Sequence, residues 1–264
     1  MDRQLKAGAE IPFETACNFR ELGGYEAMDG RHVKFGLIYR GVALSHRMSQ
    51  ADKDKIASMN LKYILDLRAA GEAELDPDFV PEGVRHERIC GLWVDENTEF
   101  DFSPGAIEKS MSQMTKDPAE MLMDFYRGMP LKNKAFKALF KELSEGNAPL
   151  LFHCSAGKDR TGTAAILILL ALGVDEETAI ADYLLTNVYR KAIIDRELEK
   201  AKKMFPDNPQ MMEKYAGKEG VLKEGAMAAL DTIKKAYGTV EKYFEAEFGL
   251  DEEGLKRLRD FYLE

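Results

Sequence analysis

A cysteine and an arginine enclose a short loop near the middle of the chain. In the segment LLFHCSAGKDRTG (150–162), five residues separate Cys154 from Arg160, and an apolar run precedes the cysteine. The apolar run that follows (163–172) predicts a buried helix, so the loop is expected to lead from a strand into that helix. Such a loop presents unpaired backbone N–H groups and the positive end of a helix dipole, which together bind anions. The segment therefore predicts a phosphate-binding loop that carries a thiol.

The residue types in this loop predict nucleophilic chemistry on phosphorus. A guanidinium matches two phosphate oxygens, and a loop glycine lets successive amides face inward as a nest. The same positive field favours the thiolate, which can attack phosphorus to form a phosphocysteine that water then hydrolyses. We assign catalytic roles to Cys154 and Arg160, substrate binding to Ser155, Ala156, Gly157 and Lys158, a hydroxyl donated to the sulfur to Thr161, and a supporting hydrogen bond to His153.

Expelling an alkoxide or phenolate requires a proton, and three aspartates compete for the role of acid. Asp159 lies inside the loop. Asp66 closes the apolar run YILDL and is expected at the carboxyl edge of a sheet, where active sites of open α/β folds collect. Asp124 lies thirty residues before the cysteine, in a predicted helix. We rank them in that order, with a capping or surface role as the alternative for each.

The loop HCSAGKDRTG resembles the H-C-x-x-G-K-D-R-[ST]-G signature of bacterial tyrosine and dual-specificity phosphatases, and eight specified positions leave little room for chance. The resemblance implies hydrolysis of phosphomonoesters without a metal or other cofactor, with phosphotyrosine proteins as the favoured substrates. It also supports a role for Asp159. One departure is Glu21, where the family more often has aspartate. Other segments that look like this family are NFRELGGY (18–25), GLIYRG (36–41), YILDLR (63–68) and residues 248–263.

Two alternative functions stay open. CSAGKDR is also similar to the CKAGKGR loop of phosphoinositide 3-phosphatases, with which it shares Lys158, while Ser155 replaces their second lysine. A loop lysine could meet a neighbouring ring phosphate, so phosphoinositides are the alternative substrates. From another class, the chain could be a phosphate-sensing binding protein, although such a protein would normally have lost the cysteine or the arginine.

Residues outside the loop are expected to complete the site. Arg20 and Arg40 stand in the resembling N-terminal segments, and a basic rim formed by them would bind the anionic substrate on an acidic chain. Salt bridges to the many carboxylates are the alternative role. Asn18 is expected to fix a turn against the loop rather than to contact substrate.

Composition limits the other classes. The net charge of -9 argues against binding to nucleic acid or to an anionic membrane, and no apolar run reaches the length of a membrane span. The first ten residues lack the apolar core of a signal peptide, so a cytoplasmic location is expected, with secretion by another route left open. Three cysteines are too few and too scattered for a disulfide framework or a metal site, and Cys17 and Cys90 are expected in the core. The oligomeric state is left open.

Apolar and helical patterns alternate along the chain. Strands are predicted at 36–40, 61–67, 84–94 and 149–153, helices at 50–59 and 131–144, and an almost wholly helical half from 175 to 264. This order predicts one α/β domain over 1–264, with a mostly parallel central sheet flanked by helices and a helical C-terminal half. The segment 190–225 carries Met204, Met211 and Met212 with few large aliphatics, and a helical lid over the active site is expected there. A surface helical pair packed on the core is the alternative.

Overall fold

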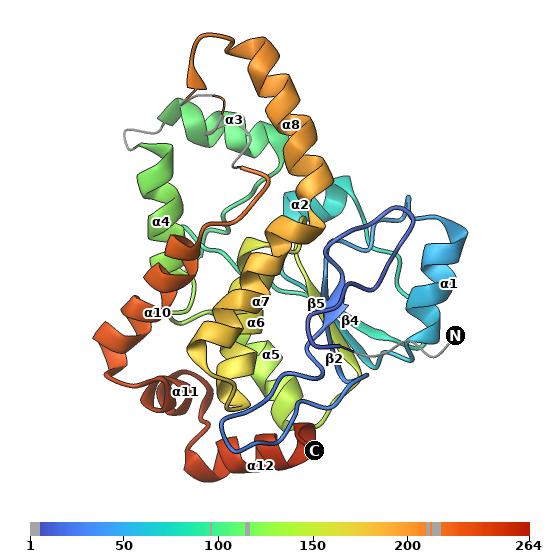
Figure 1. Ribbon diagram of the computed structural model, residues 1–264, viewed down its shortest axis with the longest axis vertical. Coiled ribbons are helices and arrows are strands. Elements are labelled where there is room, and N and C mark those ends of the chain that lie inside the picture. The colour runs from blue at the N-terminus through green and yellow to red at the C-terminus, as the bar shows by residue number, and fades with distance from the viewer. Residues whose placement is uncertain (1–5, 96, 114–116, 210–211, 213–217) are drawn as a thin grey trace.

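The central element of the computed structural model is a five-stranded sheet, shown in Figure 1. The structure describes residues 6–95, 97–113, 117–209, 212 and 218–264. The strand order is β1-β2-β5-β3-β4, and only the edge strand β1 is antiparallel to its neighbour. The strands are β1 Arg20–Glu21, β2 Ile38–Gly41, β3 Tyr63–Asp66, β4 Arg85–Arg88 and β5 Leu150–His153.

The predicted α/β class and mostly parallel sheet are confirmed. β3 and β5, in the middle of the sheet, are buried along their whole length, which explains why they read as continuous apolar runs. The strand predicted at 84–94 is wrong in length, because β4 ends at Arg88 and the chain then leaves the sheet edge, so that Cys90 and Leu92 enter the core. β1 was not predicted, since two residues carry no strand pattern.

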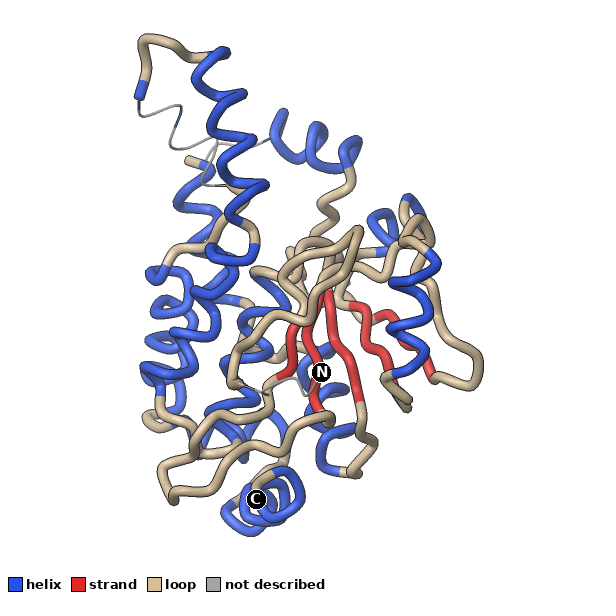
Figure 2. Tube along the Cα trace, turned by 45° about the vertical axis from the view of Figure 1, so that its right-hand side comes forward, coloured by secondary structure: helices blue, strands red, loops and turns tan. Residues whose placement is uncertain are grey.

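Helices cover both faces of the sheet. Ile64 and Leu151 point to a small core beneath α1 (Gln50–Ser58), whereas Leu65 and Phe152 point to the large core under the other helices. Figure 2 shows this asymmetry, with α1 on one side of the strands and most helices on the other. The remaining described helices on both sides are α2 Ala70–Leu75, α3 Pro104–Gln113, α4 Pro118–Gly128, α5 Lys134–Ser144, α6 Asp159–Ala171, α7 Glu176–Tyr189, α8 Lys191–Met204, α10 Lys223–Tyr237, α11 Val240–Phe248 and α12 Glu252–Tyr262.

The helix α6 is the central helix that the sequence predicted. Almost all its residues are buried, and the chain turns at Gly173, whose φ of +86° suits glycine. Asp175 then caps α7 by accepting a hydrogen bond from the Thr178 amide. This tight hairpin fixes α7 against α6, and α7 thereby brings its own side chains up to the loop.

The segment predicted as a lid is described in part. In Figure 1, α8 rises with α3 and α4 beyond the carboxyl ends of the strands, and α10 packs against α4. Met211 lies outside the described residues, so the lid over 190–225 stays a prediction. None of the described helices is both long and apolar enough to cross a bilayer.

Candidate active site

The loop between β5 and α6 curls tightly against the end of β2. Cys154 follows the strand directly and is 2% exposed, and α6 begins at Asp159. Gly157 has a φ of +65°, and a Cβ added there would lie 2.6 Å from the carbonyl oxygen of Gly41. Only glycine therefore fits the curl, as its place in the motif predicted.

Donors outside the loop hold its carbonyl groups. The Asn18 side-chain amide donates to the carbonyls of Gly157 (3.0 Å) and Ala156 (3.3 Å), and Arg40 Nη2 donates to the same Gly157 carbonyl at 2.9 Å. With these carbonyls held outward, the backbone turns its amides toward the concave side of the loop. The prediction that Asn18 fixes a turn against the loop is confirmed.

The predicted basic rim of Arg20 and Arg40 is wrong. Both side chains are fully buried and share the carboxylate of Asp182 on α7, with Arg20 Nε at 2.8 Å and Arg40 Nη1 at 2.7 Å. Burial raises the pKa of Asp182, but the two guanidinium charges outweigh it and lower that pKa to about 2. Arg20 also donates to the Asn18 side-chain oxygen at 2.6 Å, so the cluster supports the loop from behind.

Arg160 is held by Glu72, a residue of the short helix α2. Arg160 Nη1 lies 2.7 Å from Glu72 Oε2 and Nη2 lies 2.9 Å from Oε1, a bidentate pair that is nearly buried. Burial raises the pKa of Glu72, but the hydrogen bond and the charge of Arg160 lower it by more. The net pKa lies below its usual value, so the carboxylate stays ionised. The Ser155 hydroxyl donates to the same carboxylate at 2.5 Å, and the Phe102 ring lies 5.1 Å from the guanidinium carbon.

The environment of Cys154 favours the thiolate. Burial raises the pKa of the thiol, but the Arg160 charge and the hydroxyl and amide of Thr161 outweigh burial and bring the pKa below its usual value. The two other cysteines are unlike it, and burial raises the pKa of both. Cys90 is buried as predicted, while Cys17 is only half-buried, so its predicted core position is wrong.

His153 supports the loop from beneath. It is fully buried, its Nδ1 lies 3.2 Å from the Cys154 carbonyl oxygen, and its Nε2 lies 3.1 Å from Oδ2 of Asp78. The first contact confirms the predicted hydrogen bond to nearby backbone. Burial lowers the pKa of His153, but the carboxylates of Asp78 and Asp66 raise it above its usual value, which favours a charged imidazolium beside Asp78.

The position of Asp66 does not suit a side chain that must donate a proton to a leaving group. Both of its oxygens accept hydrogen bonds from Arg68 at 2.9 Å, and the carboxylate is 1% exposed. It shares a sheet face with His153, its partner in the β3–β5 register, over the α1 side. Because the carboxylate is enclosed and its oxygens are occupied, the structure does not support Asp66 as an acid.

Four side chains around this carboxylate could by proximity hold a metal ion, which the sequence did not reveal: Asp66, Asp78, His86 and His153 offer ligand atoms within 4.8 Å of one another. Arg68 already pairs with both aspartates, reaching Asp78 Oδ1 at 2.9 Å. The guanidinium supplies the positive charge that a metal would bring, so we interpret the group as a buried ion-pair network.

Asp159 keeps access to the outside of the loop. It is the first residue of α6, and its side chain is 28% exposed. One oxygen accepts a hydrogen bond from the Tyr126 hydroxyl of α4, and the other lies 3.4 Å from Lys158 Nζ. Of the three aspartates, Asp159 therefore best fits a donor that must reach a leaving group.

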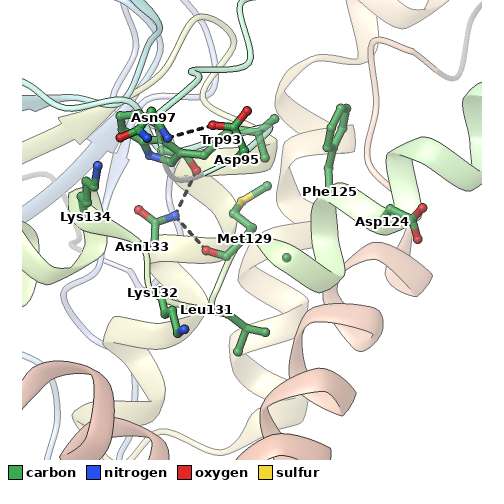
Figure 3. Close-up of a pocket in the computed structure, with 13 residues that line it drawn as sticks. Trp93, Asp95, Asn97, Asp124, Phe125, Met129, Leu131, Lys132, Asn133 and Lys134 are labelled. Atoms are coloured by element: carbon green, nitrogen blue, oxygen red, sulfur yellow. Dashed lines mark hydrogen bonds between the residues drawn. The ribbon is translucent and has the colours of Figure 1, made fainter. Parts of the chain in front are cut away.

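Asp124 borders a separate cavity, shown in Figure 3. The cavity measures about 490 Å³ and lies between residues 91–97 and the elbow joining α4 to α5; its described lining includes neither Cys154 nor Arg160. Asp124 pairs with Arg127 at 2.8 Å, one turn further along α4. Its position as the last of the three acid candidates is consistent with this geometry.

Lys158 contacts the chain that follows α8. Its Nζ donates to the carbonyls of Lys218 and Gly220, the latter at 3.2 Å. Arg190, at the start of α8, donates to the carbonyl of Glu219 at 2.8 Å and pairs with its carboxylate. The segment 218–220 thus lies beside the loop, and Lys158 is bound to protein oxygens in this structure.

Sequence reasoning missed the partners of the loop. Glu72, Asp78, Tyr126, Asp182 and Arg190 all contact loop residues or their supports, and none belongs to the motif. Glu72 did carry a local signal, since its side chain accepts from the Ala69 amide at the start of α2. That signal indicates a helix start and says nothing of an arginine 88 positions away.

A thiol inclined to ionise, a fixed guanidinium and a curled loop lie together at the sheet's carboxyl edge, an arrangement that suits chemistry on phosphate. The profile of the tyrosine phosphatase family matches residues 11–264, and the chain belongs to that family. It is accordingly a protein-tyrosine-phosphatase by class.

Several known proteins are similar. The triple specificity protein phosphatase PtpB of Mycobacterium tuberculosis is 29% identical over 279 residues, covering 96% of this chain and 98% of that protein. A tyrosine-protein phosphatase of Nostoc commune is 28% identical, covering 81% of this chain and 70% of its own. Among solved structures, Pseudomonas aeruginosa TpbA has a TM-score of 0.36 at 13% identity, covering 78% and 96% of the two chains. The PP-IP phosphatase SIW14 of Saccharomyces cerevisiae has a TM-score of 0.32 at 19%, covering 79% and 86%.

Proposed function

We propose that this phosphatase hydrolyses phosphotyrosine in proteins through a phosphocysteine on Cys154. The observation that carries the proposal is the buried thiol beside an arginine that Glu72 holds in a bidentate pair. A guanidinium fixed in advance binds phosphate without reorganisation and stabilises the charge on its oxygens in the transition state. The thiolate needs no separate base, because its surroundings already favour ionisation.

The first step transfers the phosphoryl group to sulfur. Glu72 occupies the end of the guanidinium formed by Nη1 and Nη2, so the edge formed by Nε and Nη2 is the one that faces a phosphate. The Cys154 sulfur forms a bond to phosphorus while the bond to the tyrosine oxygen breaks. Asp159 gives its proton to that oxygen, and the dephosphorylated tyrosine side chain of the substrate protein leaves.

The second step returns the enzyme to its starting state. Water attacks phosphorus, the sulfur–phosphorus bond breaks, and the Asp159 carboxylate takes a proton from the water. Thr161 favours the thiolate in the structure, so it stabilises the sulfur as it leaves. Inorganic phosphate is released, and Asp159 is again protonated for the next substrate.

The substrate range is proposed to extend beyond phosphotyrosine to phosphoserine and phosphothreonine. Two observations support this: the match to the tyrosine phosphatase family and the name of the mycobacterial relative, a triple specificity protein phosphatase. An aryl phosphate should be turned over fastest, because a phenolate leaves more easily than an alkoxide.

Phosphoinositide hydrolysis is the second candidate, and it depends on Lys158. In the structure this ammonium is bound to the carbonyls of Lys218 and Gly220, so a second phosphate on an inositol ring would have to displace them. We propose that this activity is secondary. Lys158→Ala should lower phosphoinositide turnover more than phosphopeptide turnover, whereas an equal loss on both would show that Lys158 acts on the loop as a whole.

The covalent intermediate is the sharpest test. Acid quenching during turnover of a ³²P-labelled phosphotyrosine peptide should leave label on Cys154, identified by peptide mapping. Cys154→Ser should abolish turnover to below about 1% while retaining phosphate binding, because the loop and Arg160 persist. Cys90→Ser, which also alters a buried thiol, should keep both activity and labelling. Turnover by Cys154→Ser above that level would refute the mechanism.

A further inference from the structure

Two buried tyrosine hydroxyls meet at the carboxyl group of Asp159. Tyr126 lies on α4 and Tyr183 on α7, and they are 2% and 0% exposed. The Tyr126 hydroxyl contacts both Asp159 Oδ1 and the Tyr183 hydroxyl, the two tyrosine oxygens lying 2.7 Å apart. Two helices thus supply consecutive hydroxyl groups to one carboxyl group of the loop.

Two glycines make room for these rings. A Cβ on Gly162 of α6 would lie 2.6 Å from Tyr183 Cδ2, and a Cβ on Gly225 of α10 would lie 2.6 Å from Tyr126 Cε2. The two rings meet edge to face, with centroids 6.5 Å apart and planes at 88°. The hydroxyl pair is therefore fixed by packing on both sides, and the last glycine of the phosphatase motif is part of that packing.

The direction of the hydrogen bonds follows from chemistry. Burial, and after it the charge of Asp159, raises the pKa of Tyr126 well above its usual value. The phenol therefore stays protonated and donates a hydrogen bond to the carboxylate. Its oxygen is then left to accept from Tyr183, whose pKa burial also raises. The chain Tyr183 to Tyr126 to Asp159 occupies Oδ1 of the carboxyl group and leaves Oδ2 to carry the transferable proton.

We propose that Tyr126, supported by Tyr183, is a positioning residue for Asp159, the acid that protonates the leaving group. This inference rests on the proposed function, which assigns that role to Asp159. The Tyr126 hydroxyl fixes the orientation of the carboxyl group so that Oδ2 faces the leaving oxygen.

Other charged groups act on the same carboxyl group. Lys158 Nζ lies 3.4 Å from Oδ2, and the Cys154 thiolate interacts with Asp159 across the loop. Arg40 acts on Tyr183 from the side of β2. These groups are unchanged when only a tyrosine hydroxyl is removed, so a change in leaving-group dependence reports on that hydroxyl.

Tyr126→Phe removes the donor and keeps the ring. We expect kcat for phenyl phosphate, a poor leaving group, to fall about tenfold, since hydrogen bonds to charged groups are worth that factor or more. For p-nitrophenyl phosphate, whose leaving group scarcely needs the proton, the loss should stay within about twofold. Tyr183→Phe should act in the same direction with a smaller effect.

Tyr262→Phe is the matched control, because it removes the hydroxyl of a buried tyrosine that bonds the Leu143 carbonyl at 3.1 Å, away from the loop. It should leave the leaving-group dependence unchanged. Adding Tyr126→Phe to Asp159→Asn should cause no further loss of kcat for phenyl phosphate, because the hydroxyl acts through the carboxyl group.

The inference would be overturned if Tyr126→Phe lowered kcat equally for phenyl phosphate and p-nitrophenyl phosphate, and if this loss added to that of Asp159→Asn in the double variant. Tyr126 would then be a packing residue. If Asp159→Asn itself shows no preference for good leaving groups, the proposed acid fails as well. The two failures are therefore distinguishable, and Tyr183→Phe provides an independent reading if Tyr126→Phe does not fold.

Discussion

Two clusters of buried arginine and carboxylate flank the phosphate loop, one in front and one behind. In front, a single arginine, Arg160, meets a single carboxylate, Glu72. Behind, Arg20 and Arg40 share the carboxylate of Asp182, which also accepts from the Tyr25 hydroxyl at 2.9 Å. Both clusters use the same ion-pair chemistry in a dry environment, and both contact the loop directly.

The two clusters differ in what their guanidinium groups are left to bind. The front cluster balances one positive charge with one negative charge, and the edge formed by Nε and Nη2 of Arg160 is the one proposed to bind phosphate. The rear cluster carries two guanidiniums whose hydrogen bonds go to Asp182 and to the oxygens of Asn18 and Gly157. Burial and charge therefore do not identify a substrate-binding arginine. Such an arginine is identified by the direction of the N–H donors that its ion pair leaves unused. The carboxylate that binds the guanidinium sets that direction.

The largest effect on activity is expected in the front cluster. Arg160→Lys keeps the charge but loses the planar fork, so kcat/KM for an aryl phosphate should fall about 10²–10³-fold with little change in thermal stability. Arg127→Lys, in an exposed pair on α4, is the control and should be neutral. A loss within about threefold for Arg160→Lys would mean that charge alone, and not bidentate geometry, holds the phosphate.

The largest effect on stability is expected in the rear cluster. Asp182→Asn leaves two buried guanidiniums without a counter-charge, and the free energy of unfolding should fall by about 3–5 kcal/mol in urea titrations. Asp260→Asn, at an exposed carboxylate paired with Arg31, should change it by less than about 1 kcal/mol. Similar small changes in both variants would contradict a structural role for the rear cluster.

The rear cluster should also show a pH signature. The pKa of Asp182 is lowered to about 2, below its usual value of 3.8, so its contribution to stability is complete above about pH 4. It is lost as the pH falls toward 2, when the carboxyl group must take up a proton. The stability difference between wild type and Asp182→Asn should therefore narrow over this interval. A constant difference across it would mean that the carboxylate does not titrate with folding.

A smaller effect on activity is expected when the front cluster is loosened without losing its arginine. Glu72→Gln keeps the size of the side chain but removes the charge that holds Arg160, and kcat/KM should fall about tenfold. Glu142→Gln, at a buried carboxylate near Arg85, offers a control away from the loop. Comparable losses in both variants would indicate general destabilisation rather than a role in positioning.

The smallest effect is expected at Thr161, within the loop itself. Its hydroxyl lowers the pKa of Cys154, so Thr161→Val should raise that pKa and slow alkylation by iodoacetamide severalfold in the part of the pH profile where the wild-type rate still rises with pH. Thr163→Val, two residues further along α6, should leave the alkylation rate unchanged. If both variants were alkylated at the same rate, Arg160 and the loop amides alone would account for the stabilisation of the thiolate.

The sequence by itself determined the chemistry and its local frame. Cys154, Gly157 and Arg160 act through the backbone that joins them, and a strand, a curl and a helix N-terminus follow from consecutive residues. For the same reason the sequence correctly placed β5 and α6. Only short-range geometry is needed for these features, and a pattern of neighbouring residues specifies short-range geometry directly.

The tertiary structure alone decided which charged residues serve the loop and how. Arg40 and Arg68 stand in similar apolar strand segments, yet one holds a loop carbonyl and the other neutralises two aspartates. Asp159 and Asp66 were the first and second candidate acids in the sequence; packing encloses Asp66 and leaves Asp159 at the surface of the loop. A buried charge takes its role from the partners that surround it, and those partners lie far away along the chain, so only the folded arrangement specifies them.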